Sequence, residues 1–86
     1  MTGGASGDAS VQHVVSRDMP VPLHEQVAAL LRARIASKDL TGRVPSIVTL
    51  AQTYEVSVKT AEHALHTLRD EGLIVVVKGR GYFIAP

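Results

Sequence analysis

The 86-residue sequence contains no cysteine, so disulfides, thiolate metal sites and thiol nucleophiles are all excluded. This absence fits a reducing compartment, and the cytoplasm is the expected location. No apolar run approaches the roughly 20 residues that span a bilayer. The opening stretch MTGGASGDAS has neither the basic nor the apolar region of a signal peptide. We therefore expect no membrane partner.

Aromatic residues are scarce, since Tyr54, Tyr82 and Phe83 are the only ones. Proteins that bind single-stranded nucleic acid stack successive bases on aromatic side chains. Three aromatic rings are too few for this, which favours double-stranded nucleic acid as the partner. The net charge is only +1, which by itself is weak evidence for a nucleic-acid partner. The positive charge is local, because Lys78 and Arg80 stand close together near the C-terminus.

The sequence also lacks the residue patterns of an enzyme or a metalloprotein. No nucleophile lies beside a base at an informative spacing, and Gly79-Arg80-Gly81 is too short for a dinucleotide-binding fingerprint. His63 and His66, with Glu62 beside them, have the spacing of helical metal ligands, but the sequence places no third ligand. We expect no enzymatic activity, no cofactor and no metal.

The stretch from Val56 to Ile74 organises the rest of the chain. Its apolar residues recur at i, i+3, i+4 and i+7, which predicts a helix over about residues 57–71 with one buried stripe. The opposite face carries Lys59, His63, His66 and Asp70. Ser57 is placed to cap the first turn and Gly72 to end the helix. The positive end of the helix dipole then lies at residues 58–60, where it suits an anion.

A shorter helical pattern opens at Pro45-Ser46, and only Glu55-Val56 separates it from the cap at Ser57. Two helices joined by so short a turn cross steeply, which is the helix-turn-helix arrangement. After Gly72, two strand-like segments, 73–77 and 82–85, flank Lys-Gly-Arg-Gly and predict a hairpin with a basic tip.

The predicted fold is therefore α+β, a winged helix-turn-helix with three helices and a C-terminal β-hairpin wing. The first helix is expected over residues 22–38, and Arg43-Val44 has the position of a short edge strand. Residues 1–10 have the composition of a disordered tail, and residues 11–19 could be a strand or an extended arm. We divide the chain into an arm, 1–19, and a domain, 20–86.

The domain resembles the DNA-binding domain of GntR-type winged helix-turn-helix transcriptional regulators. Similar segments follow one another in the family's order: residues 22–28 and 31–35 in the first helix, 44–46 with 50–51 in the second, Val56-Ser57, Thr60 and Ala64-Leu65 in the third, 71–74 after it, and 78–84 in the wing.

The resemblance implies a regulator of transcription that binds double-stranded DNA sequence-specifically and favours a repressor. The helix at 57–71 would lie in the major groove, and the wing, residues 78–81, on the backbone or in the minor groove. The family usually has arginine at the positions of Val48, Val58 and Glu62, facing phosphates and guanine edges. Their absence here motivates an alternative, a protein-interaction module with weakened DNA binding.

The candidate DNA-binding residues lie at the two helix starts and at the hairpin tip. They are Ser46, Ser57, Val58, Lys59, Thr60, His63, Lys78, Gly79, Arg80 and Gly81. The serines can cap their helices, bind phosphate, or do both. Lys59 could reach a base edge or a phosphate, and His63 follows it one turn later. Thr60 could donate to a phosphate or bond within its own helix.

Two further residues of the same helix have open interpretations. Val58 could touch a thymine methyl, which would favour A·T at that position, or pack against the preceding helix. Glu62 could accept a hydrogen bond from cytosine or repel phosphate.

We expect a weak or DNA-dependent homodimer, because a single small module makes few phosphate contacts. Members of the family normally continue past the wing into an effector-binding and oligomerisation domain, whereas this sequence ends at Pro86. It would then be a minimal member or a fragment, and its effector ligand is unknown.

Overall fold

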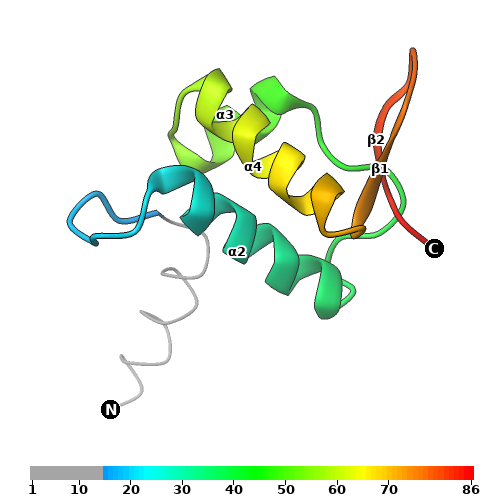
Figure 1. Cartoon of the computed structure of the whole chain (residues 1–86). Coiled ribbons are helices and arrows are strands. Elements are labelled where there is room, and N and C mark those ends of the chain that lie inside the picture. Colours follow the sequence, from blue (N-terminus) through cyan, green and yellow to red (C-terminus); the bar gives the residue numbers. More distant parts are fainter. Residues whose placement is uncertain (1–14) are drawn as a thin grey trace.

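The computed structural model describes residues 15–86, which form three helices followed by a two-stranded hairpin (Figure 1). The helices are α2 (Leu23–Ala36), α3 (Ile47–Tyr54) and α4 (Val58–Asp70), and the strands are β1 (Ile74–Val77) and β2 (Gly81–Ile84). This is the predicted α+β winged helix-turn-helix. No helix in this part of the chain is long and apolar enough to cross a membrane.

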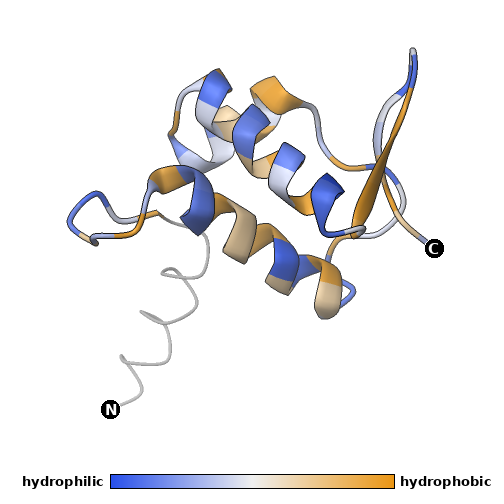
Figure 2. Ribbon diagram, in the orientation of Figure 1, coloured by the Kyte–Doolittle hydropathy of each residue, from blue (hydrophilic) through white to orange (hydrophobic). Residues whose placement is uncertain are grey.

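The core lies between α2, α3 and α4, and the first strand closes one end of it. The predicted stripe of α4 is buried in full, with Ala61, Ala64 and Leu65 at 0% exposure and Leu68 at 1%. Figure 2 shows α2 and α4 with hydrophobic segments between them and hydrophilic segments outside. The other buried core side chains are Val15, Val27, Ala28, Leu31, Leu40, Val44, Leu50, Ala51, Tyr54 and Ile74.

The ends of α4 are set by the residues that the sequence indicates. The Ser57 side chain accepts a hydrogen bond from the Thr60 N–H at 3.0 Å. Gly72 has φ +80° and its N–H bonds to the Arg69 carbonyl, while the Leu73 N–H returns to the Leu68 carbonyl. Glycine is favoured there because a side chain at positive φ is strained.

The first helix ends two residues earlier than predicted, at Ala36 rather than residue 38. Ser37 is the C-cap and Lys38 takes a left-handed conformation with φ +67°, which a continuing helix does not permit. The chain then turns back, and the Leu40 N–H bonds to the Arg34 carbonyl.

The wing is an antiparallel hairpin in which Val75 pairs with Phe83 and Val77 with Gly81. Gly81 therefore begins β2, whereas the sequence placed it in the tip and started the strand at Tyr82. Arg43 forms an isolated bridge to Phe83, and the Val44 N–H donates to the Tyr82 carbonyl at 2.9 Å. The expected edge segment thus pairs with β2, although only as a bridge.

Residues 15–22, which include the last part of the assigned arm, pack against the helices. Val15 is 9% exposed and belongs to the core. Gln26 holds this segment, because its side chain accepts from the Ser16 N–H and donates to the Ser16 and Val21 carbonyls. The tail at 1–10 and residues 11–14 of the possible strand or arm lie outside the described residues, and residues 15–19 form no strand.

Candidate nucleic-acid interface

The N-terminal ends of α3 and α4 and the wing tip all lie toward the top of the view in Figure 1. A surface hollow of about 230 Å³ joins two of these elements, because Ser46, Ile47 and Val48 line it together with Gly81 and Tyr82 of β2. The start of α3 is therefore next to the tip end of β2, where Gly81 pairs with Val77.

The same capping arrangement begins both helices. Ser46 accepts from the Thr49 N–H at 3.1 Å, as Ser57 does from Thr60, and each serine hydroxyl lies 2.9 Å from the threonine hydroxyl. The expected capping role of both serines is confirmed. Because Ser57 donates its proton to the Thr60 oxygen, the Thr60 proton is left for an outside acceptor.

The first turn of α4 also presents backbone donors. The first four N–H groups of a helix have no partner within it. Ser57 satisfies those of Thr60 and Ala61, through its side chain and its carbonyl respectively. The N–H groups of Val58 and Lys59 remain at the positive end of the dipole, where an anion is favoured.

Lys59 and Glu62 line a shallow hollow of about 200 Å³ on the outer surface of α4, together with His63 and His66. Lys59 is exposed and has no ion-pair partner among the described residues. Its ammonium group is free to meet a phosphate or a base edge. Within residues 15–86, no group of three or more His, Asp or Glu side chains is arranged to hold a metal.

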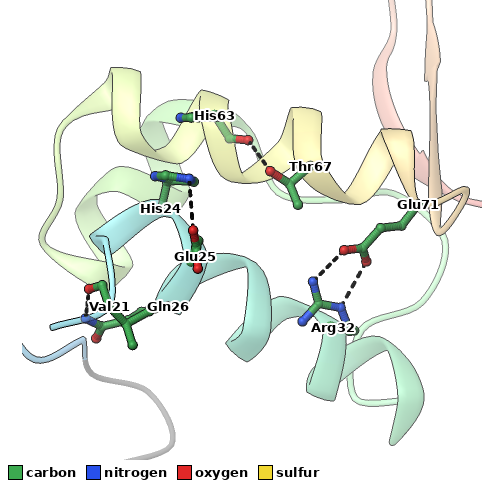
Figure 3. Close-up of polar contacts among 8 residues, drawn as sticks. All are labelled: Val21, His24, Glu25, Gln26, Arg32, His63, Thr67 and Glu71. Carbon is green, nitrogen blue, oxygen red and sulfur yellow. Dashed lines mark hydrogen bonds and ion pairs between the residues drawn. The ribbon is translucent and has the colours of Figure 1, made fainter. Parts of the chain in front are cut away.

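His63 makes a contact that the sequence analysis did not predict. Its ring stacks on that of His24 from α2, with centroids 3.7 Å apart and planes inclined by 11° (Figure 3). His24 in turn lies 4.0 Å from the Glu25 carboxylate. His63 therefore lies on the α2 side of α4, and a DNA contact from it stays a prediction.

The tip of the wing carries two exposed cations, Lys78 and Arg80, around Gly79 with φ +81°. The Arg80 N–H closes the turn on the Val77 carbonyl at 2.8 Å. Neither cation forms an ion pair within the part of the chain that the structure describes. Both charges are available to phosphates.

Arg43 is a third cation beside the wing, and the sequence analysis did not include it among the candidates. Its guanidinium carbon lies 6.0 Å from the centre of the Phe83 ring, a cation–π contact. A Cβ at Gly81 would lie 3.7 Å from its terminal nitrogen. The sequence could have indicated Arg43, because it directly precedes the apolar Val44 in the expected edge strand. A strand places neighbouring side chains on opposite faces, so a buried Val44 leaves Arg43 on the outer face.

Arg32 and Arg34 are held in ion pairs away from this surface. Arg32 of α2 makes two hydrogen bonds to Glu71, at 2.9 and 2.7 Å, which join α2 to the end of α4 (Figure 3). The Arg32 guanidinium lowers the pKa of the Glu71 carboxyl through these bonds. Arg34 pairs with Asp39 at 3.1 Å.

Val48 and Val58 are 55% and 51% exposed. Val58 therefore packs only in part against its surroundings, and its outer half is open to solvent. Each valine lies in the first turn of its helix: Val58 directly follows Ser57, and Val48 is two residues after Ser46.

Three short helices with a steep turn between the last two, followed by a hairpin, define a winged helix-turn-helix domain. The sequence model of the family described as "Bacterial regulatory proteins, gntR family" matches residues 23–84. The chain belongs to this family.

Relatives and a solved structure agree with this assignment. An uncharacterised HTH-type transcriptional regulator of Rhizobium meliloti (strain 1021) is 41% identical over 76 residues, covering 86% of this chain and 31% of that protein. The HTH-type transcriptional repressor NagR of Bacillus subtilis (strain 168) is 30% identical over 73 residues, covering 83% of this chain and 30% of the repressor.

The DBD of AraR in complex with operator ORX1 superposes with a TM-score of 0.76 at 26% identity, covering 84% of this chain and 94% of that one. This chain thus matches almost all of a solved domain, and about a third of the two longer regulators.

Proposed function

We propose that this domain binds double-stranded DNA sequence-specifically and acts in a transcriptional regulator, as a repressor. The observation that carries the proposal is that two capped helix starts and a cationic hairpin tip lie toward the same side of the domain, in a chain of the GntR family. The operator in the AraR complex and the repressor role of NagR support it.

In the proposed complex α4 enters the major groove by its N-terminal end. The free N–H groups of Val58 and Lys59 and the Thr60 hydroxyl would receive a phosphate, since helix N-termini bind anions. Lys59 then reaches a base edge or the neighbouring phosphate. Lys78 and Arg80 follow the backbone or enter the minor groove, where Gly79 permits a close approach.

The domain would act as a weak or DNA-dependent homodimer in the cytoplasm. Two-fold operators with half-sites about one helical turn apart let two small modules add their contacts. No effector ligand is assigned, and no cofactor or metal enters the proposal.

A second candidate is a protein-interaction module with weak DNA affinity. The exposed Val48 and Val58 and the acidic Glu62, all on the surface described above, favour it. Such a module would lack a preferred duplex sequence.

Selection of bound duplexes from a random pool separates the two candidates. The DNA-binding proposal predicts enrichment of one motif over several rounds, and retention of that motif over non-specific competitor at low salt. Recovery of an unchanged random pool would contradict it and favour the interaction module.

A further inference from the structure

Six large hydrophobic side chains are exposed within residues 15–86, and five of them lie on α3, α4 or the wing. These five are Val48, Val58, Val75, Val76 and Val77. In Figure 2 the start of α3 and the strand β1 are among the most hydrophobic segments. Exposed apolar groups gathered on one part of a small protein mark a surface that is covered in its working state.

The surroundings of Val48 and Val58 restrict what can cover them. Free N–H groups and Lys59 lie beside Val58, and the threonine hydroxyl follows two residues later. An apolar protein surface would bury these donors without acceptors, which costs free energy. The partner must therefore present apolar groups and anionic oxygens together.

The major groove of duplex DNA has this combination. Each thymine projects a C5-methyl group into the groove, with the phosphates along both rims. Guanine presents acceptors there, for which a valine has no donor, and cytosine presents a donor, for which it has no acceptor. Of the four bases, thymine is the one that an exposed valine side chain complements.

We propose that Val48 and Val58 read thymine methyl groups in the major groove and so set the sequence preference of this domain. The inference rests on the proposed DNA binding and extends it to the base that each helix start selects. Val58 lies in the first turn of α4, the end that enters the groove, and Val48 lies in the first turn of α3, beside the tip end of β2.

The test replaces single thymines by deoxyuridine in the duplex selected from a random pool. This change removes one methyl group and leaves every hydrogen-bonding group in place. The wild-type domain should lose about fourfold in affinity at each thymine that a valine contacts, the effect of one methyl-sized group leaving a buried position. Titrations by fluorescence anisotropy measure the loss.

Val58→Ala should bind the thymine duplex about fourfold more weakly and should no longer distinguish thymine from deoxyuridine at one position. Val48→Ala should do the same at a different position. Both valines are half exposed and lie in helices, where alanine is the better former, so the fold should be retained. Circular dichroism checks this.

Met19→Ala is the matched control, because Met19 is 51% exposed but precedes α2 and belongs to none of α3, α4 and the wing. It should keep the full thymine-to-deoxyuridine ratio of the wild type. If the wild type binds its selected duplex equally well after every replacement, the inference is overturned while the proposed function stands. If no duplex is selected, the inference and the proposed function are both overturned. If Val58→Ala or Val48→Ala keeps the full thymine-to-deoxyuridine ratio, that valine does not contact a thymine methyl group.

Discussion

At the residue scale, the first turn of α4 combines a structural and a binding role in Ser57. Its hydroxyl caps the helix through the Thr60 N–H, and it lies beside the N–H groups that would hold a phosphate. The two roles make different demands. A cap needs only an acceptor, whereas a phosphate site cannot contain a negative charge.

Two substitutions of Ser57 separate these roles. Ser57→Ala should lower the free energy of unfolding by about 1 kcal/mol, because the Thr60 N–H loses its acceptor. Ser57→Asp should retain the stability, since aspartate caps equally well, but should weaken duplex binding because its carboxylate repels the phosphate. Urea denaturation and a mobility-shift titration measure the two effects. Wild-type affinity in the aspartate variant would show that no phosphate lies at this helix start.

The histidine pair shows where residue-level inference from the sequence stops. Helical periodicity placed His63 opposite the buried stripe, but its ring stacks on His24 of α2, so it lies on the flank of α4 that faces α2. The approach of one helix to another depends on the packing of both. Arg43 was missed for a related reason, since its closeness to Gly81 follows from how the chain returns to β2.

At the element scale, the wing carries its charge at the tip, and α2 is linked to α4 by an ion pair. Hydrophobic periodicity and capping residues were enough to predict α3 and α4 closely and the hairpin to within one residue at each strand. The early end of α2 was not predicted, because Lys38 adopts a positive φ that its residue type does not favour.

The wing makes a quantitative prediction about salt. If Lys78 and Arg80 each neutralise one phosphate, changing both to alanine should lower the magnitude of the negative slope of log K against log salt by about 1.8, at ~0.9 per phosphate. The loss should be alike on selected and shuffled duplexes. A salt titration of wild type and the double variant measures it, and an unchanged slope would remove the wing from the binding surface.

The ion pair between Arg32 and Glu71 predicts a dependence of stability on pH. Because its pKa is lowered in the folded state, the Glu71 carboxylate stabilises the fold above the ordinary glutamate range, and this contribution is lost as the pH falls through the folded pKa. Glu71→Gln should therefore be less stable than the wild type at pH 7, and the difference should disappear as the pH falls below the ordinary glutamate value of ~4.3 and through the lower pKa of the folded state.

Thermal unfolding across this pH range checks the ion-pair prediction. Asp70→Asn is the control, because the Asp70 carboxylate lies 3.4 Å from the Arg69 of its own helix and joins no second element. A Glu71→Gln variant that stays as stable as the wild type at pH 7 would contradict it.

At the scale of the whole molecule, the domain is small and offers few charges to a duplex. The winged helix-turn-helix class was predictable because many weak signals agreed: two helical periods, two serine caps, a terminal glycine and a basic hairpin tip. The packing of residues 15–22 was not, since it depends on Gln26 reaching the Ser16 and Val21 carbonyls across the start of α2.

Because one domain makes few contacts with DNA, we predict that two copies assemble on DNA and that the free protein is mostly monomeric. Sedimentation of the free protein should show mostly monomer, and addition of a duplex with two half-sites about one helical turn apart should give a complex with two copies. A tight dimer of the free protein in the absence of DNA would contradict this prediction.

Sequence-specific recognition of a duplex through the start of α4 is most directly tested by one ratio of affinities. The selected duplex and a shuffled duplex of the same composition are titrated with the wild type and with Lys59→Ala at one salt concentration. The wild type should prefer the selected duplex by about 100-fold or more, the effect of two or more mismatches at ~1–3 kcal/mol each. Lys59→Ala should lose much of this preference and little of its binding to the shuffled duplex. Equal affinity of the wild type for both duplexes would contradict the account.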